Sequence, residues 1–566
     1  MQTNRHTALA LFLLLCAAVG WGGRPPDAVG RRGMVVSSNL MASRIGLSIL
    51  RRGGNAIDAA VATGFALAVV DPRAGNIGGG GFMVIRFGDG STTSIDFREK
   101  APASATRDLY LDENGEVIPE LSATGILASG VPGSVRGLGL ALEQYGTLPW
   151  QTVVSPAVEL AENGFAVSYQ LHEDLRRMQD RLAQFEGTAR IFYPQGRPLR
   201  LNALFRQPDL AATLRRIAAQ GPDEFYTGLT ARLIASHMRV RGGLITMQDL
   251  RDYRAVERPP VEFSYRDTRI ISMGPPSSGG IVLAQILNQL EHTDLAQLEF
   301  HSAQHIHLMV EAERRAFADR AYHLGDPDFV PVPVAELTSK EYAARRWQDV
   351  SPAWASVSKQ VSYGNVMTFS ETHQTTHYSV VDRWGNAVAV TTTINALYGS
   401  GELVKGAGFL LNDEMDDFSA KPDHPNMFGL LGGHANAIEP GKRMLSSMTP
   451  TIVARHDSLL MVVGSPGGSR IITTVAQVIS NVVDFGLGLK EAVEAPRFHH
   501  QWLPDVVLSE PRGISRETRQ RLARMGHTVR YGDDMMGAAH CIYVDPRTGW
   551  YFGAVDSRRA AGAAGY

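Results

Sequence analysis

The chain has 566 residues, enough for a large buried core, and its 44% hydrophobic and 20% charged residues are ordinary for a globular protein. Its formal net charge of −2 argues against nucleic acid or an anionic membrane as a partner. Length alone does not fix the number of domains, because large mixed folds exceed the usual size of one domain.

The N-terminus is typical of an export signal. Arg5 precedes an apolar run over residues 8–19, which is too short to span a membrane. We expect residues 1–23 to be removed and the product to reach the periplasm or the cell exterior. A core helix, or a lipid anchor at Cys16, is the alternative. Because the only other cysteine is Cys541, removal of the signal would leave no intrachain disulfide.

The first half of the chain alternates helical and strand-like patterns. Residues 40–70 predict two helices, separated by a break at 53–55. A run of four glycines then leads into a predicted strand at 82–87, and residues 92–97 predict the returning strand. Residues 131–242 are mostly helical in pattern, with glycines at the breaks.

The second half of the chain has different sequence patterns. Apolar residues at helical spacing around Val310 predict one long helix. Residues 351–374 are polar with weak periodicity, which predicts a loop or linker. Two alternating, β-branched strands follow at 377–382 and 387–394, joined as a hairpin. A further strand is predicted at 459–463.

The predicted hairpin brings hydroxyl side chains together. A turn symmetric about the middle of its loop would place Thr375 opposite Thr393, and His377 opposite Thr391. Alternation along the strand puts Thr393 and Asn395 on one face. Two hydroxyls and an amide would then converge where the polar segment ends. The alternative is a strand rich in threonine only because threonine favours strands.

A glycine-rich turn at residues 464–468 precedes a predicted helix that Ser469 would cap and that stops at Gly486. Backbone N–H groups exposed at such a turn can hold a negative charge, as in an oxyanion hole. The turn lacks the lysine of a phosphate-binding loop, so nucleotide binding is not expected. A plain tight turn is the alternative.

Two other groups of polar residues give weaker evidence about function. His301, His305 and His307 have no carboxylate at a recognised metal-ligand spacing, so we expect no metal site. The acidic run at 414–417 fits either a solvated turn or a binder of an amino group.

Several longer motifs stand at intervals along the chain. They are NIGGGGFM at 76–83, DFREK at 96–100, QTTHYSVVD at 374–382, DEMDDF at 413–418, LSSMTP at 445–450, GSPGGSR at 464–470 and APRFHHQWL at 495–503. In sequence and order they resemble the gamma-glutamyltransferase family, which belongs to the N-terminal-nucleophile hydrolases. The resemblance covers nearly everything from about residue 33 to the C-terminus.

The resemblance implies an α+β fold, a four-layer αββα sandwich. It also implies a precursor that cuts itself between Gln374 and Thr375. The large chain would then comprise residues 24–374 and the small catalytic chain residues 375–566. The two would remain one intertwined heterodimer.

Roles for individual residues follow from the same resemblance. Thr375 would be the nucleophile, and its freed α-amine the base, since an α-amine titrates at about 7.7–8.0. Thr393 would orient Thr375, while Gly467 and Gly468 would form the oxyanion hole. The residues implied for the substrate's α-carboxylate are Arg98, Ser446 and Ser447, and those for its α-ammonium group are Asn395, Glu414 and Asp417.

The implied activity is cleavage of glutathione and other γ-glutamyl donors, with transfer of the acyl group to water, amino acids or peptides, and with no cofactor. A lid resembling the family's spans residues 422–433 and carries Phe428 at the gate position, where no phenolic hydroxyl can bond to Asn395. An acylase for glutaryl or cephalosporin side chains is one alternative, although it would not need Glu414 and Asp417. A non-catalytic binding protein of the same fold is another.

Overall fold

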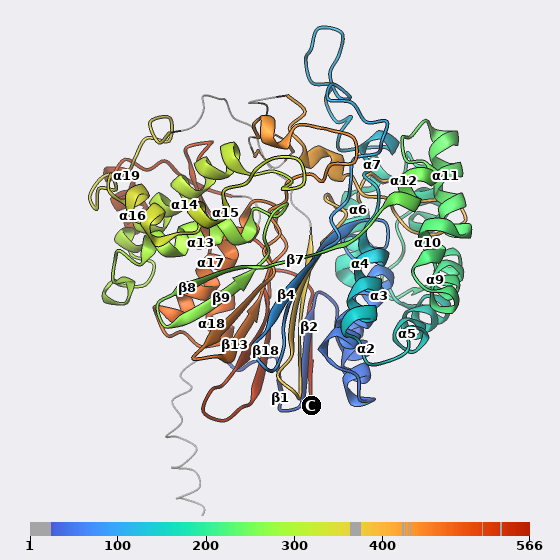
Figure 1. Cartoon of the computed structure of the whole chain (residues 1–566), viewed down its shortest axis with the longest axis horizontal. Coiled ribbons are helices and arrows are strands. Elements are labelled where there is room, and N and C mark those ends of the chain that lie inside the picture. Colours follow the sequence, from blue (N-terminus) through green and yellow to red (C-terminus); the bar gives the residue numbers. More distant parts are fainter. Residues whose placement is uncertain are drawn as a thin grey trace, which may run out of the picture.

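The computed structural model describes residues 24–362, 375–421, 424, 426–427, 429–430, 432–511, 513–532 and 535–566. The predicted signal at 1–23, Gln374 and Phe428 therefore lie outside the described residues. Two seven-stranded antiparallel sheets lie face to face, and helices cover the outer side of each (Figure 1). The expected four-layer α+β sandwich is confirmed.

The first sheet contains the predicted hairpin. Its strands, in spatial order, are β19 (Gly562–Gly565), β2 (Gly33–Ser37), β10 (Thr376–Asp382), β11 (Ala387–Thr393), β3 (Gly80–Arg86), β4 (Thr92–Asp96) and β7 (Val256–Arg258). The two strands of the hairpin, β10 and β11, thus lie in the middle of the sheet.

The second sheet is assembled from both ends of the chain and its middle. Its strands, in spatial order, are β1 (Ala28–Gly30), β18 (Tyr551–Val555), β17 (His540–Val544), β13 (Ser458–Val463), β12 (Thr451–Arg455), β9 (Thr268–Ser272) and β8 (Val261–Tyr265). The strand predicted at 459–463 is therefore β13.

Helices of the first half pack on the first sheet. The main ones are α2 (Leu40–Arg51), α3 (Ala56–Val70), α4 (Ser134–Tyr145), α5 (Trp150–Asn163), α6 (Tyr169–Arg177), α9 (Pro208–Gln220), α10 (Asp223–Thr227), α11 (Leu229–Arg241) and α12 (Met247–Asp252). The predicted break at 53–55 is confirmed. Asn55 caps α3 and exchanges hydrogen bonds with Asp58 in a capping box.

Helices of the second half pack on the second sheet. The main ones are α13 (Gly279–Leu290), α14 (Ala303–His323), α16 (Lys340–Trp347), α17 (Arg470–Val483), α18 (Leu489–Glu494) and α19 (Arg516–Arg524). Helix α14 is the predicted long helix. Residues 351–362, the described part of the polar segment, form no helix or strand.

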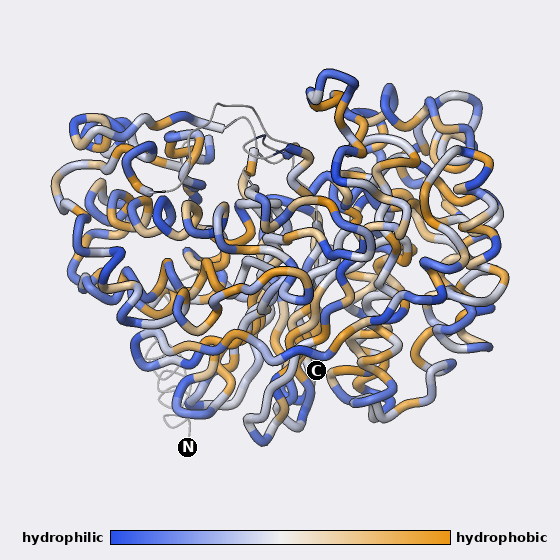
Figure 2. Tube along the Cα trace, turned by 45° about the horizontal axis from the view of Figure 1, so that its top comes forward, coloured by the Kyte–Doolittle hydropathy of each residue, from blue (hydrophilic) through white to orange (hydrophobic). Residues whose placement is uncertain are grey.

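The core lies on both faces of the hairpin strands. Val380, Val388 and Val390 pack toward the first helical layer, whereas Val381 and Ala389 pack between the two sheets. Every residue of β10 and β11 is buried, so both faces of these strands are covered. Hydrophobic stretches gather along these central strands and the helices on them (Figure 2). No helix among the described residues has the length and apolar character to span a bilayer.

Candidate active site

One narrow cavity gathers nearly all of the predicted site residues. Its volume is about 20 Å³, room for little more than one water molecule. The residues lining it are Arg98, Thr375, Thr393, Asn395, Glu414, Asp417, Leu430, Ser446, Ser447, Met448, Gly468 and Ile471. Of the other predicted residues, Gly467 lines an adjoining cavity, and Gln374 lies outside the described residues. Leu430, Met448 and Ile471 are lining residues to which the sequence assigns no role.

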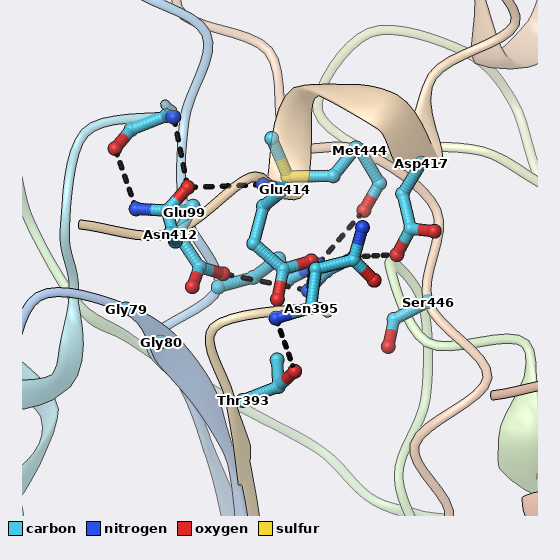
Figure 3. A network of polar contacts seen from close by, with 12 residues as sticks. Gly79, Gly80, Glu99, Thr393, Asn395, Asn412, Glu414, Asp417, Met444 and Ser446 are labelled. Carbon is cyan, nitrogen blue, oxygen red and sulfur yellow. Dashed lines mark hydrogen bonds and ion pairs between the residues drawn. The ribbon is translucent and has the colours of Figure 1, made fainter. Parts of the chain in front are cut away.

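The hairpin places the two threonines. His377 pairs with Thr391 across β10 and β11, so the predicted register is confirmed. Continuing the same ladder puts Thr375 opposite Thr393, and both side chains are buried. The Thr393 hydroxyl accepts a 2.7 Å hydrogen bond from the backbone N–H of Asn395 (Figure 3). A left-handed backbone at Asn395, with φ of 70°, turns the chain directly after β11.

Arg98 follows β4 and is completely buried. Its backbone N–H donates to Asp96 over 2.9 Å, and its Nε and Nη2 atoms donate to the carbonyls of Met444 and Leu445 over 3.3 Å. The guanidinium also forms short ion pairs with Glu414 and Asp417. These contacts hold the guanidinium at the cavity and occupy the donors that a substrate carboxylate would use.

A third carboxylate, Glu99, completes this charge cluster. Its Oε2 atom lies 3.4 Å from Nη1 of Arg98. Burial and the neighbouring Glu414 raise the pKa of Glu99 well above its usual range, which favours its neutral form. Burial, opposed by Arg98, raises the pKa of Glu414 to about 7. Burial also opposes the charge of Arg98, but Glu414 and Asp417 outweigh it and raise its pKa.

The acidic run is built into the protein interior. Its four residues form a 3₁₀ turn, η4 (Glu414–Asp417), in which Glu414 is fully buried. Asn412 anchors the turn: its Oδ1 accepts from the N–H of Glu414 and its Nδ2 donates to the carbonyls of Gly78 and Gly130. The solvated-turn interpretation is therefore wrong. Glu414, Asn395 and Asp417 lie side by side in the site (Figure 3).

Two adjacent serines, Ser446 and Ser447, also line the cavity. The backbone of Ser446 is paired with Pro276 and Ser278, while the hydroxyl of Ser447 accepts from Nη2 of Arg320 over 3.2 Å. Arg320 lies on α14 and is 4% exposed. Burial lowers the pKa of Arg320 to about 10, and Asp417 opposes this. Sequence reasoning missed both Arg320 and Glu99; their only signal was a charged residue inside an otherwise buried segment.

The glycine turn lies between β13 and α17. Gly467 and Gly468 have φ of 137° and 55°, values that favour glycine, and their carbonyls accept from the N–H groups of Arg470 and Ile471. Ser469 is the N-cap residue of α17, as predicted, but its side chain makes no capping hydrogen bond and instead donates to Gln501 over 2.7 Å.

Three potential metal ligands also meet at α14, which contains two of them. His307, Glu311 and His527 bring ligand atoms within 4.8 Å of one another. These atoms are already engaged: Nδ1 of His307 lies 2.8 Å from Nε2 of His527, and Glu311 pairs with Arg314 and Arg315. Arginines so close would repel a cation, and no metal site is assigned there.

Comparison with known proteins identifies the family. The family model described as Gamma-glutamyltranspeptidase matches residues 42–566. The chain is 50% identical over 529 residues to the glutathione hydrolase proenzyme of Escherichia coli (strain K12), covering 93% of this chain and 90% of that one. Its structure is similar to that of a cephalosporin acylase from Bacillus halodurans, with a TM-score of 0.83, 27% identity, and coverage of 97% and 98%.

A second solved structure matches a part of the chain. A chain of Helicobacter pylori gamma-glutamyltranspeptidase is 44% identical with a TM-score of 0.57, and the match covers 60% of this chain and 96% of that one. Since the family model spans most of the sequence and a relative shares half of its residues, the chain belongs to the gamma-glutamyltranspeptidase family.

Proposed function

We propose that this protein cleaves the γ-glutamyl amide bond of glutathione and related donors, and passes the acyl group to water, amino acids or peptides. The observation that carries the proposal is the cavity beside Thr375, which offers Arg98 for an α-carboxylate and Glu414 with Asp417 for an α-ammonium group. A free amino acid head is the ligand that this pair of charges fits. Its side chain would then extend toward Thr375.

Donor binding would exchange one set of ion pairs for another. In the free site Arg98 pairs with Glu414 and Asp417, and the space between them is about 20 Å³. The α-carboxylate would take over the donors of Arg98, and the α-ammonium group would take over the two carboxylates. Because buried charges then stay paired throughout, the exchange avoids the cost of an unpaired charge.

Maturation would create the catalytic base. We assign the cut to the bond between Gln374 and Thr375, giving chains that end at residue 374 and begin at residue 375. The Thr375 hydroxyl would attack the carbonyl carbon of Gln374, replacing the C–N bond by an ester that water opens. The α-amine freed at Thr375 titrates at about 7.7–8.0 in its ordinary environment, so it accepts a proton near neutral pH.

Turnover would use the same two groups. The α-amine takes the proton of the Thr375 hydroxyl as Oγ1 attacks the γ-carbonyl of the donor, and it passes that proton to the departing amine. Gly468 lines the cavity together with Thr375, and Gly467 precedes it, which supports assigning their backbone N–H groups to the oxyanion. Water or an acceptor amine then attacks the ester carbon, the C–Oγ1 bond breaks, and the proton returns to Thr375 through the α-amine.

The acylase alternative has a specific observation behind it, since a cephalosporin acylase has a similar structure. An acyl group with a carboxylate but no α-amino group would draw Arg98 away from Glu414 and Asp417 and offer them no cation in exchange. Their burial beside Arg98 supports a γ-glutamyl donor. The presence of Thr375, Gly467 and Gly468 argues against a binding protein without catalysis.

The proposed place of action is outside the cytoplasm. The apolar run at residues 8–19, behind a basic residue, supports export to the periplasm or the exterior.

The test is the mass and activity of the variant Thr375→Ala. It should remain one chain and hydrolyse no γ-glutamyl-p-nitroanilide, because it lacks the attacking hydroxyl. Thr376→Ala is the matched control: that hydroxyl donates to Ser38 over 2.9 Å and does not line the cavity. The control should mature into two chains and stay active. Cleavage or activity in Thr375→Ala would refute the assigned nucleophile.

A further inference from the structure

Arg320 contacts one of the serines that line the narrow cavity. It belongs to the last turn of α14 and is 4% exposed. Its Nη2 atom donates to Oγ of Ser447 over 3.2 Å, and its Nε atom donates to Oγ of Ser278 over 2.9 Å. Arg320 itself does not line the cavity, so it would act on a bound donor through these serines.

The bond to Arg320 decides what the Ser447 hydroxyl can do. A guanidinium only donates, so the Ser447 oxygen must accept in this bond. The hydroxyl proton of Ser447 is then left for another acceptor, and none of the residues that the structure describes accepts it. Since Ser447 lines the cavity, an acceptor bound in the cavity is the partner that remains.

Ser446 has the same arrangement. Its Oγ atom accepts from the backbone N–H of Met448 over 3.1 Å, and its hydroxyl donates to no described residue. Arg320 reaches this serine through Ser278, whose N–H and hydroxyl donate to the carbonyl of Ser446 over 2.8 Å and 2.6 Å. One guanidinium thus holds two serines whose hydroxyl protons are both available to a ligand with several lone pairs, such as a carboxylate.

The charge of Arg320 has no direct partner among the described residues. The acid that acts on it, Asp417, already pairs with Arg98. Burial lowers the pKa of Arg320 to about 10, which Asp417 opposes, so the guanidinium is still charged at neutral pH. A buried charge without a partner is costly, and an anion bound nearby would reduce that cost.

We propose that Arg320 is a positioning residue for the α-carboxylate of the donor. It fixes Ser447 directly, and Ser446 through Ser278, as hydrogen-bond donors into the cavity. Its charge also attracts the carboxylate that these serines bind. The inference rests on the proposed function, because the carboxylate belongs to a γ-glutamyl donor. Arg98 remains the direct ionic contact, and Arg320 sets how strongly the serines contribute.

A purely structural role is the competing explanation, since Arg320 also ties α14 to the segments around Ser278 and Ser447. The two roles differ in the ligands that they affect. A positioning role acts only on ligands that carry an α-carboxylate, whereas a distorted cavity would weaken the binding of every ligand.

The test measures competitive inhibition of γ-glutamyl-p-nitroanilide hydrolysis by two small acids. L-Glutamate carries the complete amino acid head, and 4-aminobutanoate is the same molecule without its α-carboxylate. Arg320→Gln should raise the inhibition constant of L-glutamate about tenfold, as expected when charge-assisted hydrogen bonds are weakened, and should change that of 4-aminobutanoate by less than about twofold. KM for the nitroanilide should rise by a similar factor, with kcat little changed.

Ser447→Ala should raise the inhibition constant of L-glutamate with the same selectivity. Because Arg320 acts in part through Ser447, the effect of the double variant should be smaller than the product of the two single effects. Thr449→Ala is the matched control. Its buried hydroxyl donates to the carbonyl of Ser447 over 2.9 Å but lines no part of the cavity, so both inhibition constants should stay unchanged.

Equal rises for the two inhibitors in Arg320→Gln, no rise for L-glutamate, or fully independent effects of Arg320→Gln and Ser447→Ala would overturn the positioning role. Arg320→Lys keeps the charge but loses the fork that spans two serines, so its selective rise should be about threefold. This variant carries the test if the glutamine variant does not mature. Absence of nitroanilide hydrolysis in the unmodified enzyme is a different result, since it would overturn the proposed function itself.

Discussion

At the scale of single residues, donor binding depends on the charges of one arginine and three neighbouring carboxyl groups. Arg98 is completely buried, and Glu99, Glu414 and Asp417 all contact it. Burial raises the pKa of Glu99 and favours its neutral form, so the charged groups that a donor meets are those of Arg98, Glu414 and Asp417. A zwitterionic head can pair with both signs of charge in this site, whereas a simple anion or cation pairs with only one.

The first prediction concerns pH. Burial, opposed by Arg98, raises the pKa of Glu414 to about 7, so this carboxyl is ionised above pH 7 and becomes neutral as the pH falls through 7. The neutral form attracts the α-ammonium group less, and kcat/KM for the donor should fall. Glu414→Gln lacks this titration. The ratio of kcat/KM between the unmodified enzyme and the variant should therefore decline between pH 8 and pH 6.

The ratio isolates Glu414 because the α-amine of Thr375 titrates in both proteins. Profiles for γ-glutamyl-p-nitroanilide from pH 5 to pH 9 provide the measurement. A ratio that stays constant over that range would show that Glu414 does not carry the ammonium contact.

A second prediction addresses the carboxylate contact. Arg98→Lys keeps the positive charge but loses the planar pair of donors, so KM for the donor should rise on the order of tenfold to hundredfold while kcat changes little. Lysine is preferred to alanine because alanine would leave buried carboxylates uncompensated. Arg315→Lys, at a buried arginine paired with Glu311, is the control and should keep its KM. An unchanged KM in Arg98→Lys would remove Arg98 from the clamp.

At the scale of elements, the proposed oxyanion hole depends on the backbone conformation of the glycine turn before α17. Gly467 has φ of 137°, which an alanine adopts only with strain of about 1–3 kcal/mol. Gly467→Ala should therefore displace the turn and lower kcat on the order of 10², the effect of losing one oxyanion donor. Steady-state kinetics on matured protein would measure this.

Gly486→Ala is the matched control for that prediction. Gly486 also has a positive φ, of 62°, an added Cβ meets nothing within 4 Å, and it lies beyond the far end of α17. This variant should lose about 1 kcal/mol of stability in a denaturant titration and keep its kcat. Equal losses of kcat in both variants would mean that the turn acts only through stability.

The elements themselves were largely predictable from local pattern. The hairpin register followed from the symmetry of its loop, and the break before α3 followed from Asn55 and its glycines. The capping hydrogen bond expected of the Ser469 side chain is absent, because that side chain donates to Gln501, which lies far along the chain. Glu99 and Arg320 were missed because a neighbour of each, Glu414 for Glu99 and Ser447 for Arg320, comes from a distant segment.

At the scale of the whole molecule, the order of strands could not be read from the sequence. β2 lies beside β10 and β19, and β3 lies beside β11, although hundreds of residues separate several of these pairs. Local propensity carries no information on such contacts. Only the resemblance to a family implied the sandwich, and the structure then explains why Thr375, Arg98 and Ser446 meet at one edge of it.

The arrangement of strands also predicts that the two chains stay together after cleavage. Ladders β19–β2, β2–β10 and β11–β3 in the first sheet, and β1–β18 and β12–β9 in the second, each join a strand before residue 374 to one after it. The cores on both faces of the first sheet likewise draw residues from both sides of the cut. Separation would expose these ladders and both cores to water.

The matured protein should therefore elute as one heterodimer in 1 M NaCl, because salt screens ion pairs between chains but not apolar burial. Far-ultraviolet circular dichroism and tryptophan fluorescence should report one coincident unfolding transition in guanidinium, with both chains released together. Thr375→Ala, which cannot mature, is the control that gives the transition of an uncut chain. Dissociation of the matured protein before its secondary structure is lost would mean that the shared sheets do not hold the chains together.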